Sequence, residues 1–126
     1  MKLKILKTSL VAASLAATGL AHADSVKIGF VTTLTTPAGV IGTDMQDAAN
    51  LAMEHIGGKM GDLDVDLIME DDGFNPDIGK HKTDNLVKQD DVDFVTGFIW
   101  SHVLLASMKS ALDGGKFLIS ANAGPS

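Results

Sequence analysis

Short runs of β-branched and other apolar residues alternate along this chain with longer segments of helical periodicity. The short runs predict strands at residues 26–32, 63–70, 92–96 and 116–120. The longer segments predict helices at residues 40–56, 75–89 and 101–113. Strands that alternate with helices of this length form a parallel sheet covered on both faces. We therefore expect an α/β fold with a doubly wound parallel sheet.

The polarity of each run predicts the order of the strands. Aspartates alternate with apolar residues from 62 to 67. One face of strand 63–70 is therefore expected to be exposed to solvent, which fits a strand at a sheet edge. The denser apolar runs fit the middle, which predicts the spatial order 63–70, 26–32, 92–96, 116–120. Ligands of such sheets bind beyond the carboxyl ends of the strands. This rule selects three loops: 33–39, 97–101 and 121–126.

Local signals place the ends and the buried sides of the helices. Asn75-Pro76 is a capping side chain followed by proline at the first helical position. Ser101 is the expected cap of the last helix, which ends at Gly114-Gly115. The stripe of Met45, Ala49 and Ala52 is expected in the core.

Residues 1–23 have the three parts of a secretory signal peptide. Lysines stand at the start, a short apolar run covers residues 10–20, and the small-x-small site Ala21-His22-Ala23 precedes Asp24. The run is too short and too rich in alanine, serine and threonine to span a membrane. We expect cleavage before Asp24 and a mature protein outside the cytoplasm.

Composition excludes several classes of chemistry and partner. The chain has no cysteine, which rules out disulfides, thiolate metal ligands and cysteine nucleophiles. Removing residues 1–23 leaves 7 lysines against 16 acidic residues, a net charge of −9, with no arginine. Such a chain is a poor candidate for nucleic acid or anionic membranes. No cofactor is predicted.

The ordered segments of the chain resemble a known family. VKIGFVTTLTTPAGVIGTDMQDAANLAMEHIGG, EDDGFNP, LVKQDDVDFVTGFIWS and FLISANAGPS are similar, in this order and spacing, to the start of periplasmic solute-binding proteins of ABC importers. The nearest branch is the leucine/isoleucine/valine-binding type, which includes receptors for aromatic acids and amides. The resemblance implies that residues 24–126 form the first part of an N-terminal ligand-binding lobe. It further implies a fragment that lacks the second lobe.

The resemblance also implies a site. Ser101 matches a serine whose hydroxyl, with amides of the helix N-terminus, holds a ligand carboxylate in the family, and free N–H groups there favour an anion. Residues at two further loops match positions that meet the ligand, and Trp100 is placed to stack on an apolar or aromatic ligand. The matching loop residues are Pro37, Ala38, Asn122, Ala123 and Gly124. Of the loop threonines 33, 35 and 36, we expect one to face the cleft.

Two local motifs invite other interpretations. Glu70-Asp71-Asp72 suggests a metal site, but the following oxygen-bearing residues lack calcium-loop spacing, so a turn closing the strand is favoured. Residues 73–80 mimic a phosphate loop, yet five residues separate the glycines and His81 stands where Ser or Thr is needed. No metal site is predicted.

Three functions follow from these observations. The leading one is an extracytoplasmic receptor, expected to be a monomer and not an enzyme, that captures an amino acid or small carboxylate and delivers it to an ABC permease in the inner membrane. An alternative is the ligand-sensing domain of a signalling receptor. A secreted hydrolase is less favoured, because GFIWS at residues 97–101 is not a Gly-x-Ser-x-Gly elbow.

Overall fold

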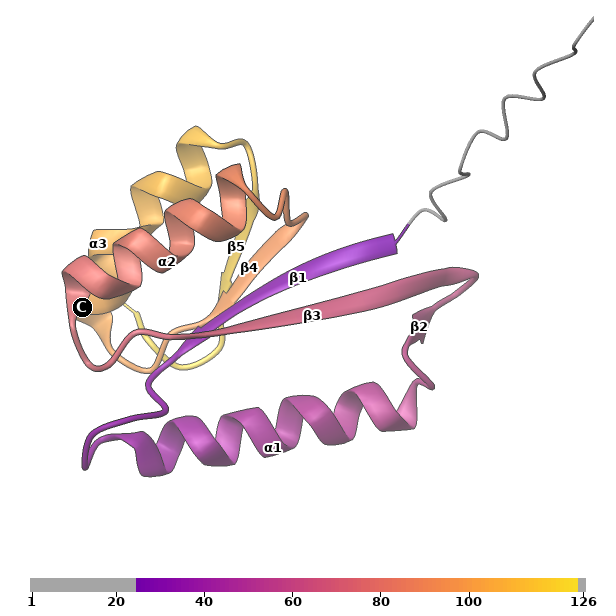
Figure 1. The fold of residues 1–126 in the computed structure, drawn as a ribbon, viewed down its shortest axis with the longest axis horizontal. Helices are drawn as coiled ribbons and strands as arrows, with labels where there is room; N and C mark the ends of the chain where they lie inside the picture. Colours follow the sequence, from indigo (N-terminus) through magenta and orange to yellow (C-terminus); the bar gives the residue numbers. More distant parts are fainter. Residues whose placement is uncertain (1–24, 125–126) are drawn as a thin grey trace, which may run out of the picture.

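A computed structural model describes residues 25–124 of the 126-residue chain, so the predicted signal peptide, residues 1–23, lies outside the described residues. Strands and helices alternate as the sequence pattern predicts, apart from one additional two-residue strand (Figure 1). The elements in chain order are β1 Ser25–Thr32, α1 Gly39–His55, β2 Lys59–Met60, β3 Leu63–Asp71, α2 Pro76–Lys88, β4 Phe94–Gly97, α3 Ser101–Asp113 and β5 Phe117–Ser120.

The sheet has the order β2-β3-β1-β4-β5. All neighbouring pairs are parallel except β2 and β3, and the predicted order of the four longer strands is confirmed. The prediction that strand 63–70 forms the edge is wrong, because β2 pairs outside it. A tight turn at Gly61, whose φ is +63°, folds these two residues back antiparallel on β3. With only two residues, β2 is too short to show the alternation by which a strand is predicted from sequence.

The helices form two unequal layers. α2 and α3 lie side by side on one face of the sheet, and α1 lies on the other (Figure 1). The core is on the α2–α3 side, where Val31 and Val95 are fully buried with Leu86 and Val103. On the opposite face Phe117 is 71% exposed and stacks on Phe94 at 5.7 Å. The described residues therefore cover one face of the sheet well and the other only in part.

The prediction that one stripe of α1 lies in the core is only partly confirmed. Met45 and Ala49 are half-buried, and Ala52 is exposed. The buried residues of α1 are glycines near its start, Gly39 and Gly42. A Cβ on Gly42 would lie 1.7 Å from the carbonyl oxygen of Thr33. The helix thus makes its closest approach to the sheet through backbone, while much of its far half faces solvent.

Local signals at α2 act as predicted. The Asn75 side chain caps α2 by accepting hydrogen bonds from the N–H groups of Asp77 at 2.8 Å and Ile78 at 3.2 Å, and Pro76 follows as the first helical residue. Within residues 25–124, no helix is both long enough and apolar enough to cross a membrane.

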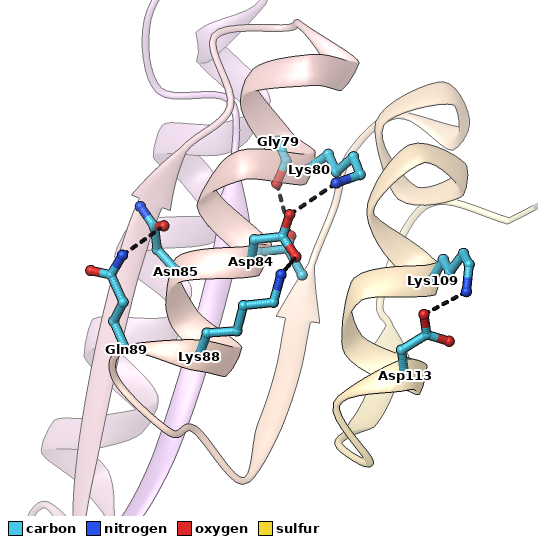
Figure 2. Close-up of polar contacts among 9 residues, drawn as sticks. Gly79, Lys80, Asp84, Asn85, Lys88, Gln89, Lys109 and Asp113 are labelled. Atoms are coloured by element: carbon cyan, nitrogen blue, oxygen red, sulfur yellow. Dashed lines mark hydrogen bonds and ion pairs between the residues drawn. The ribbon is translucent and has the colours of Figure 1, made fainter.

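Ion pairs line the outer side of the α2–α3 layer. Asp84 accepts from Lys80 at 2.9 Å and from Lys88 at 2.8 Å, each one helical turn away (Figure 2). Hydrogen bonds from Lys88 and Lys80 hold the pKa of Asp84 well below its usual range. On α3, Lys109 pairs with Asp113 in the same way (Figure 2). These contacts lie on a solvated helical surface and give it local order.

Candidate ligand-binding site

The parallel strands β1, β4 and β5 end together at one edge of the sheet. In register, Gly97 of β4 lies between Val31 of β1 and Ser120 of β5. The chain therefore leaves all three strands on the same side, and the three loops selected from the sequence start next to one another. This is the edge at which doubly wound sheets bind ligands.

The turn after β4 is built on a very close backbone approach. Gly97 has a φ of +99°, and a Cβ there would lie 2.2 Å from the carbonyl oxygen of Val31. Only glycine fits both conditions. The next residue, Phe98, also has a positive φ, of 57°, and its side chain is fully buried as an anchor. This turn carries Trp100 and Ser101 to the sheet edge.

Hydrogen bonds join the loop after β4 to the segment after β5. The Ser101 hydroxyl donates to the carbonyl oxygen of Gly124 at 2.8 Å, and the Asn122 side-chain amide donates to that of Ile99 at 3.0 Å. The backbone N–H of the buried residue Ala123 donates to the Phe98 carbonyl at 3.1 Å. Five predicted site residues are thus brought together: Trp100, Ser101, Asn122, Ala123 and Gly124.

The expected capping role of Ser101 is wrong. The N-cap of α3 is Trp100, with extended φ and ψ of −112° and 130°, and Ser101 is the first helical residue. Its hydroxyl is occupied by Gly124, and no side chain caps the helix. The first N–H groups of a helix have no intrahelical partner. The uncapped start of α3 is therefore open to an anion. The exposed Ser101 hydroxyl beside it can donate to that anion only if its single proton is shared with the Gly124 carbonyl or released from it.

Trp100 is half-buried at this edge and is held on two sides. Its indole N–H donates to the hydroxyl of Thr33 at 3.1 Å. The ring of Phe74 meets it edge-on, with centroids 4.9 Å apart and planes at 83°. Phe74 also packs edge-on against His102 at 5.1 Å. A small aromatic cluster, Phe74, Trp100 and His102, therefore borders the start of α3.

Phe74 and the loop that carries it were not selected from the sequence. The loop between β3 and α2 leaves the same sheet edge. The rule that ligands bind where the strand order reverses, between β1 and β4, does not select this loop. Phe74 is 44% exposed and has a φ of +62°. Its signal in the sequence is an aromatic side chain directly after the turn-forming pair Asp72-Gly73.

The first of the three loops, residues 33–39, contacts the site through Thr33 and is held in place by Asp71 at the end of β3. Pro37 is exposed and Ala38 half-buried, and within residues 25–124 no hydrogen bond joins either to the other two loops. Asp71 instead anchors the loop by accepting from the Leu34 N–H at 2.8 Å and from the Thr35 hydroxyl at 2.6 Å. Among the described residues, Pro37 and Ala38 are thus not joined by hydrogen bonds to the other five predicted site residues.

The oxygens of Asp71 and Glu70, in the acidic turn at the end of β3, accept from protein donors, whereas the Oδ2 atom of the buried Asp72 has no hydrogen-bond partner among the described residues. Burial raises the pKa of Asp71, but hydrogen bonds from Thr35, Leu34 and Gly73 outweigh it and hold the pKa below its usual value. Glu70 pairs with Lys82 at 2.6 Å. Over residues 25–124, no three His, Cys, Asp or Glu side chains gather with the geometry of a metal site.

Two cavities lie away from this edge. One, of about 330 Å³, opens between α2 and α3 beside Asp84. The other, of about 410 Å³, lies at the amino ends of the strands near Ser25 and Phe117. Neither cavity is lined by a residue of the candidate site.

The family of the chain follows from comparison with known proteins. A sequence model of the periplasmic binding proteins matches residues 25–126. The chain belongs to the periplasmic binding protein family. Among curated protein sequences, none matches it.

Solved structures share the fold over most of the described residues. An ABC transporter substrate-binding protein from Sphaerobacter thermophilus is 29% identical with a TM-score of 0.76, covering 81% of this chain and 28% of its own. The branched-chain amino acid transporter substrate-binding protein LivJ from Streptococcus pneumoniae, solved with isoleucine, is 28% identical with a TM-score of 0.76, covering 81% of this chain and 30% of its own.

A third structure supports the fold alone. It is a solute-binding protein of an ABC transporter from Rhodopseudomonas palustris, solved with 3,4-dihydroxybenzoic acid, at 24% identity and a TM-score of 0.76. The match covers 79% of this chain and 28% of that protein. The chain thus spans less than a third of the length of the structures that it matches.

Proposed function

We propose that this chain is the first part of the N-terminal lobe of an extracytoplasmic solute-binding receptor that delivers its ligand to the permease of an ABC importer. The observation that carries this proposal is the uncapped start of α3 beside the Ser101 hydroxyl. Family membership and the likeness to ABC substrate-binding proteins support it. The receptor captures its ligand and catalyses no reaction.

The proposed ligand is an amino acid or a small carboxylate with an apolar or aromatic body. Its carboxylate binds the first N–H groups of α3 and the Ser101 hydroxyl, because free amides and the helix dipole both favour an anion. Trp100 offers a half-buried ring to the apolar part, and Asn122 and Gly124 line the polar end. A site at a sheet edge needs a second wall to exclude water from the ligand, which the second lobe of such a receptor would supply.

Calorimetric titration of the complete protein tests the ligand contact. Isoleucine and 3,4-dihydroxybenzoate serve as probes, since related proteins were solved with them. Ser101→Ala is expected to weaken binding about 10- to 100-fold, the effect of losing a hydrogen bond to a charged group. Ser110→Ala, at a buried position further along the same helix, is the control for loss of a serine from α3 and should bind as the wild type does. Equal affinity of Ser101→Ala and wild type would contradict the proposed site, and failure of both probes would contradict the proposed ligand class.

Export is the second part of the proposal. We propose that residues 1–23 are a cleaved signal peptide and that the receptor acts in the periplasm, on the pattern of lysines, apolar run and Ala21-His22-Ala23 site. N-terminal sequencing of protein recovered from a periplasmic extract should begin at Asp24. Protein that retains Met1 or stays in the cytoplasm would contradict it.

A further inference from the structure

We propose that Asp72 is a positioning residue for the ligand site, because its Oδ1 atom holds in place two of the three rings that border the start of α3. One ring is that of Trp100, which Asp72 reaches through Thr33, and the other is that of Phe74. The inference rests on the proposed function for the role of Trp100 at the ligand, but the network itself is independent of that role.

The direction of every hydrogen bond in this network follows from the chemistry of its members. An indole N–H only donates, so the Thr33 oxygen accepts from Trp100. The single Thr33 proton is then free to donate to Asp72 Oδ1, which is its partner in the structure. The chain of donors therefore runs from Trp100 through Thr33 to Asp72, from the ends of β4, β1 and β3.

The same oxygen also fixes Phe74. The Phe74 backbone N–H donates to Asp72 Oδ1 at 2.9 Å, which holds the residue in its left-handed conformation. The Phe74 ring then lies edge-on against Trp100. One atom thus sets the positions of two side chains that contact each other, and a shift in either would move the surface offered to the ligand.

Burial makes this arrangement stiff. Asp72 and Thr33 are both fully buried, so water does not replace a lost partner at either. Trp100 is half-buried and also packs on the core. Neither Asp72 nor Thr33 reaches the surface on which a ligand would lie, so both act through the rings.

The chain offers a matched pair of substitutions to test this. Thr33→Val keeps the shape of the side chain but removes its hydroxyl, the link between Trp100 and Asp72. Thr32→Val makes the same change at the neighbouring residue, which is also fully buried but whose hydroxyl has no hydrogen-bond partner among the described residues. A general effect of Thr→Val on packing should appear in both variants.

The first measurement is the nitrogen-15 correlation signal of the Trp100 indole N–H in the complete protein without ligand, assigned by its loss in Trp100→Phe. We expect Thr33→Val to shift this signal upfield and to speed its exchange with solvent about five- to tenfold, as for the loss of one ordinary hydrogen bond. Thr32→Val should leave both unchanged. An unchanged signal in Thr33→Val would overturn the network.

The role of Asp72 is tested by comparing two substitutions. Asp72→Asn retains an oxygen that accepts from Thr33 and Phe74, and it is expected to keep the wild-type indole signal. Asp72→Ala removes the acceptor and should shift the signal as Thr33→Val does. A wild-type signal in Asp72→Ala would overturn the assignment, and if that variant does not fold, Thr33→Val decides.

Binding of isoleucine and 3,4-dihydroxybenzoate separates positioning from general destabilisation. We expect Thr33→Val to weaken binding of a probe about fivefold, and to have no further effect in a Trp100→Phe background, because it acts through that ring. An equal effect in both backgrounds would overturn positioning through Trp100. A shifted indole signal with no binding of either probe by the wild type would instead contradict the proposed ligand class and leave the network standing.

Discussion

The hydroxyl of Ser101 lies 2.8 Å from the carbonyl oxygen of Gly124, a residue 23 positions further along the chain. This bond joins the first turn of α3 to the segment after β5 at the sheet edge. Both residues are exposed, so a ligand that approaches the helix would meet this hydroxyl directly. Binding of a carboxylate would have to share the hydroxyl with Gly124 or displace it.

Ser101→Ala is expected to change stability little. The lost bond is exposed and does not cap the helix, so the free energy of unfolding should fall by about 1 kcal/mol or less. Urea unfolding followed by circular dichroism measures this. A loss above about 3 kcal/mol would mean that the serine is mainly structural, and weaker ligand binding by the variant would then not identify a contact.

Gly42→Ala is expected to destabilise the protein strongly. The new Cβ would lie 1.7 Å from the Thr33 carbonyl oxygen, so α1 must move away from β1. The free energy of unfolding should fall by about 3 kcal/mol, the upper end of the usual cost of overpacking. Asp47→Ala, at an exposed position of the same helix, is the control and should be nearly neutral. Thermal unfolding of the two variants compares them, and equal melting temperatures would refute the close approach.

Asn75→Ala is expected to cost about 1 kcal/mol of stability. The side chain caps α2 through the N–H groups of Asp77 and Ile78, which the substitution leaves without that acceptor. Asn50→Ala, an exposed asparagine inside α1, removes the same side chain where it caps nothing. Chemical unfolding should therefore separate the two variants, and a neutral Asn75→Ala would show that the cap contributes nothing.

The anchoring of the first loop by Asp71 should weaken in acid. The pKa of Asp71 is below its usual value in the folded protein, so its contribution to stability is fully present above the unfolded pKa of about 3.9 and is lost as the pH falls through the folded pKa. The difference in unfolding free energy between wild type and Asp71→Asn should be constant from pH 7 to about 5 and shrink below that. Unfolding at a series of pH values checks this, and a difference independent of pH down to the folded pKa would contradict it.

The Asp84 ion pairs should contribute a small, salt-sensitive stabilisation. Asp84→Asn removes the partner of both Lys80 and Lys88 and should cost about 1 kcal/mol or less at low salt. The cost should nearly vanish in molar salt, where exposed charges are screened. Asp113→Asn removes a single ion pair, which is more exposed than those of Asp84, and should cost about half as much. A cost for Asp84→Asn that does not change with salt would mean that packing rather than charge is lost.

The order of β3, β1 and β4 was predictable because these strands carry their burial in their own residues. The apolar strand β5 does not: it lies outermost in the described sheet, with Phe117 and Ile119 exposed. The half-polar alternation of β3 and the dense runs of β1 and β4 distinguish outer from inner strands. The two-residue strand β2 has no such signal and depends on a turn that brings Lys59 opposite Asp64. The exposure of Ala52 was also not predictable, since periodicity marks an apolar face without saying what covers it.

The candidate site was predictable to the level of loops. Parallel strands end at one edge, so polar residues after β1, β4 and β5 had to lie near one another. Phe74 was missed because it is separated from Trp100 by β4 and α2 along the chain and meets it only at that edge. The local sequence pattern indicates Asp72 only as part of a turn, because its hydrogen bond from Thr33 joins residues far apart in the chain.

The sequence alone determined the alternation of strands and helices, the parallel sheet and the capped start of α2 at Asn75, because periodicity, turn residues and caps act over a few neighbouring positions. The tertiary structure decided that Ser101 donates to Gly124 instead of capping α3, and that Trp100, Thr33 and Asp72 form one network. Each of these partners comes from a different strand end. The choice among them depends on distances that exist only once the sheet has formed.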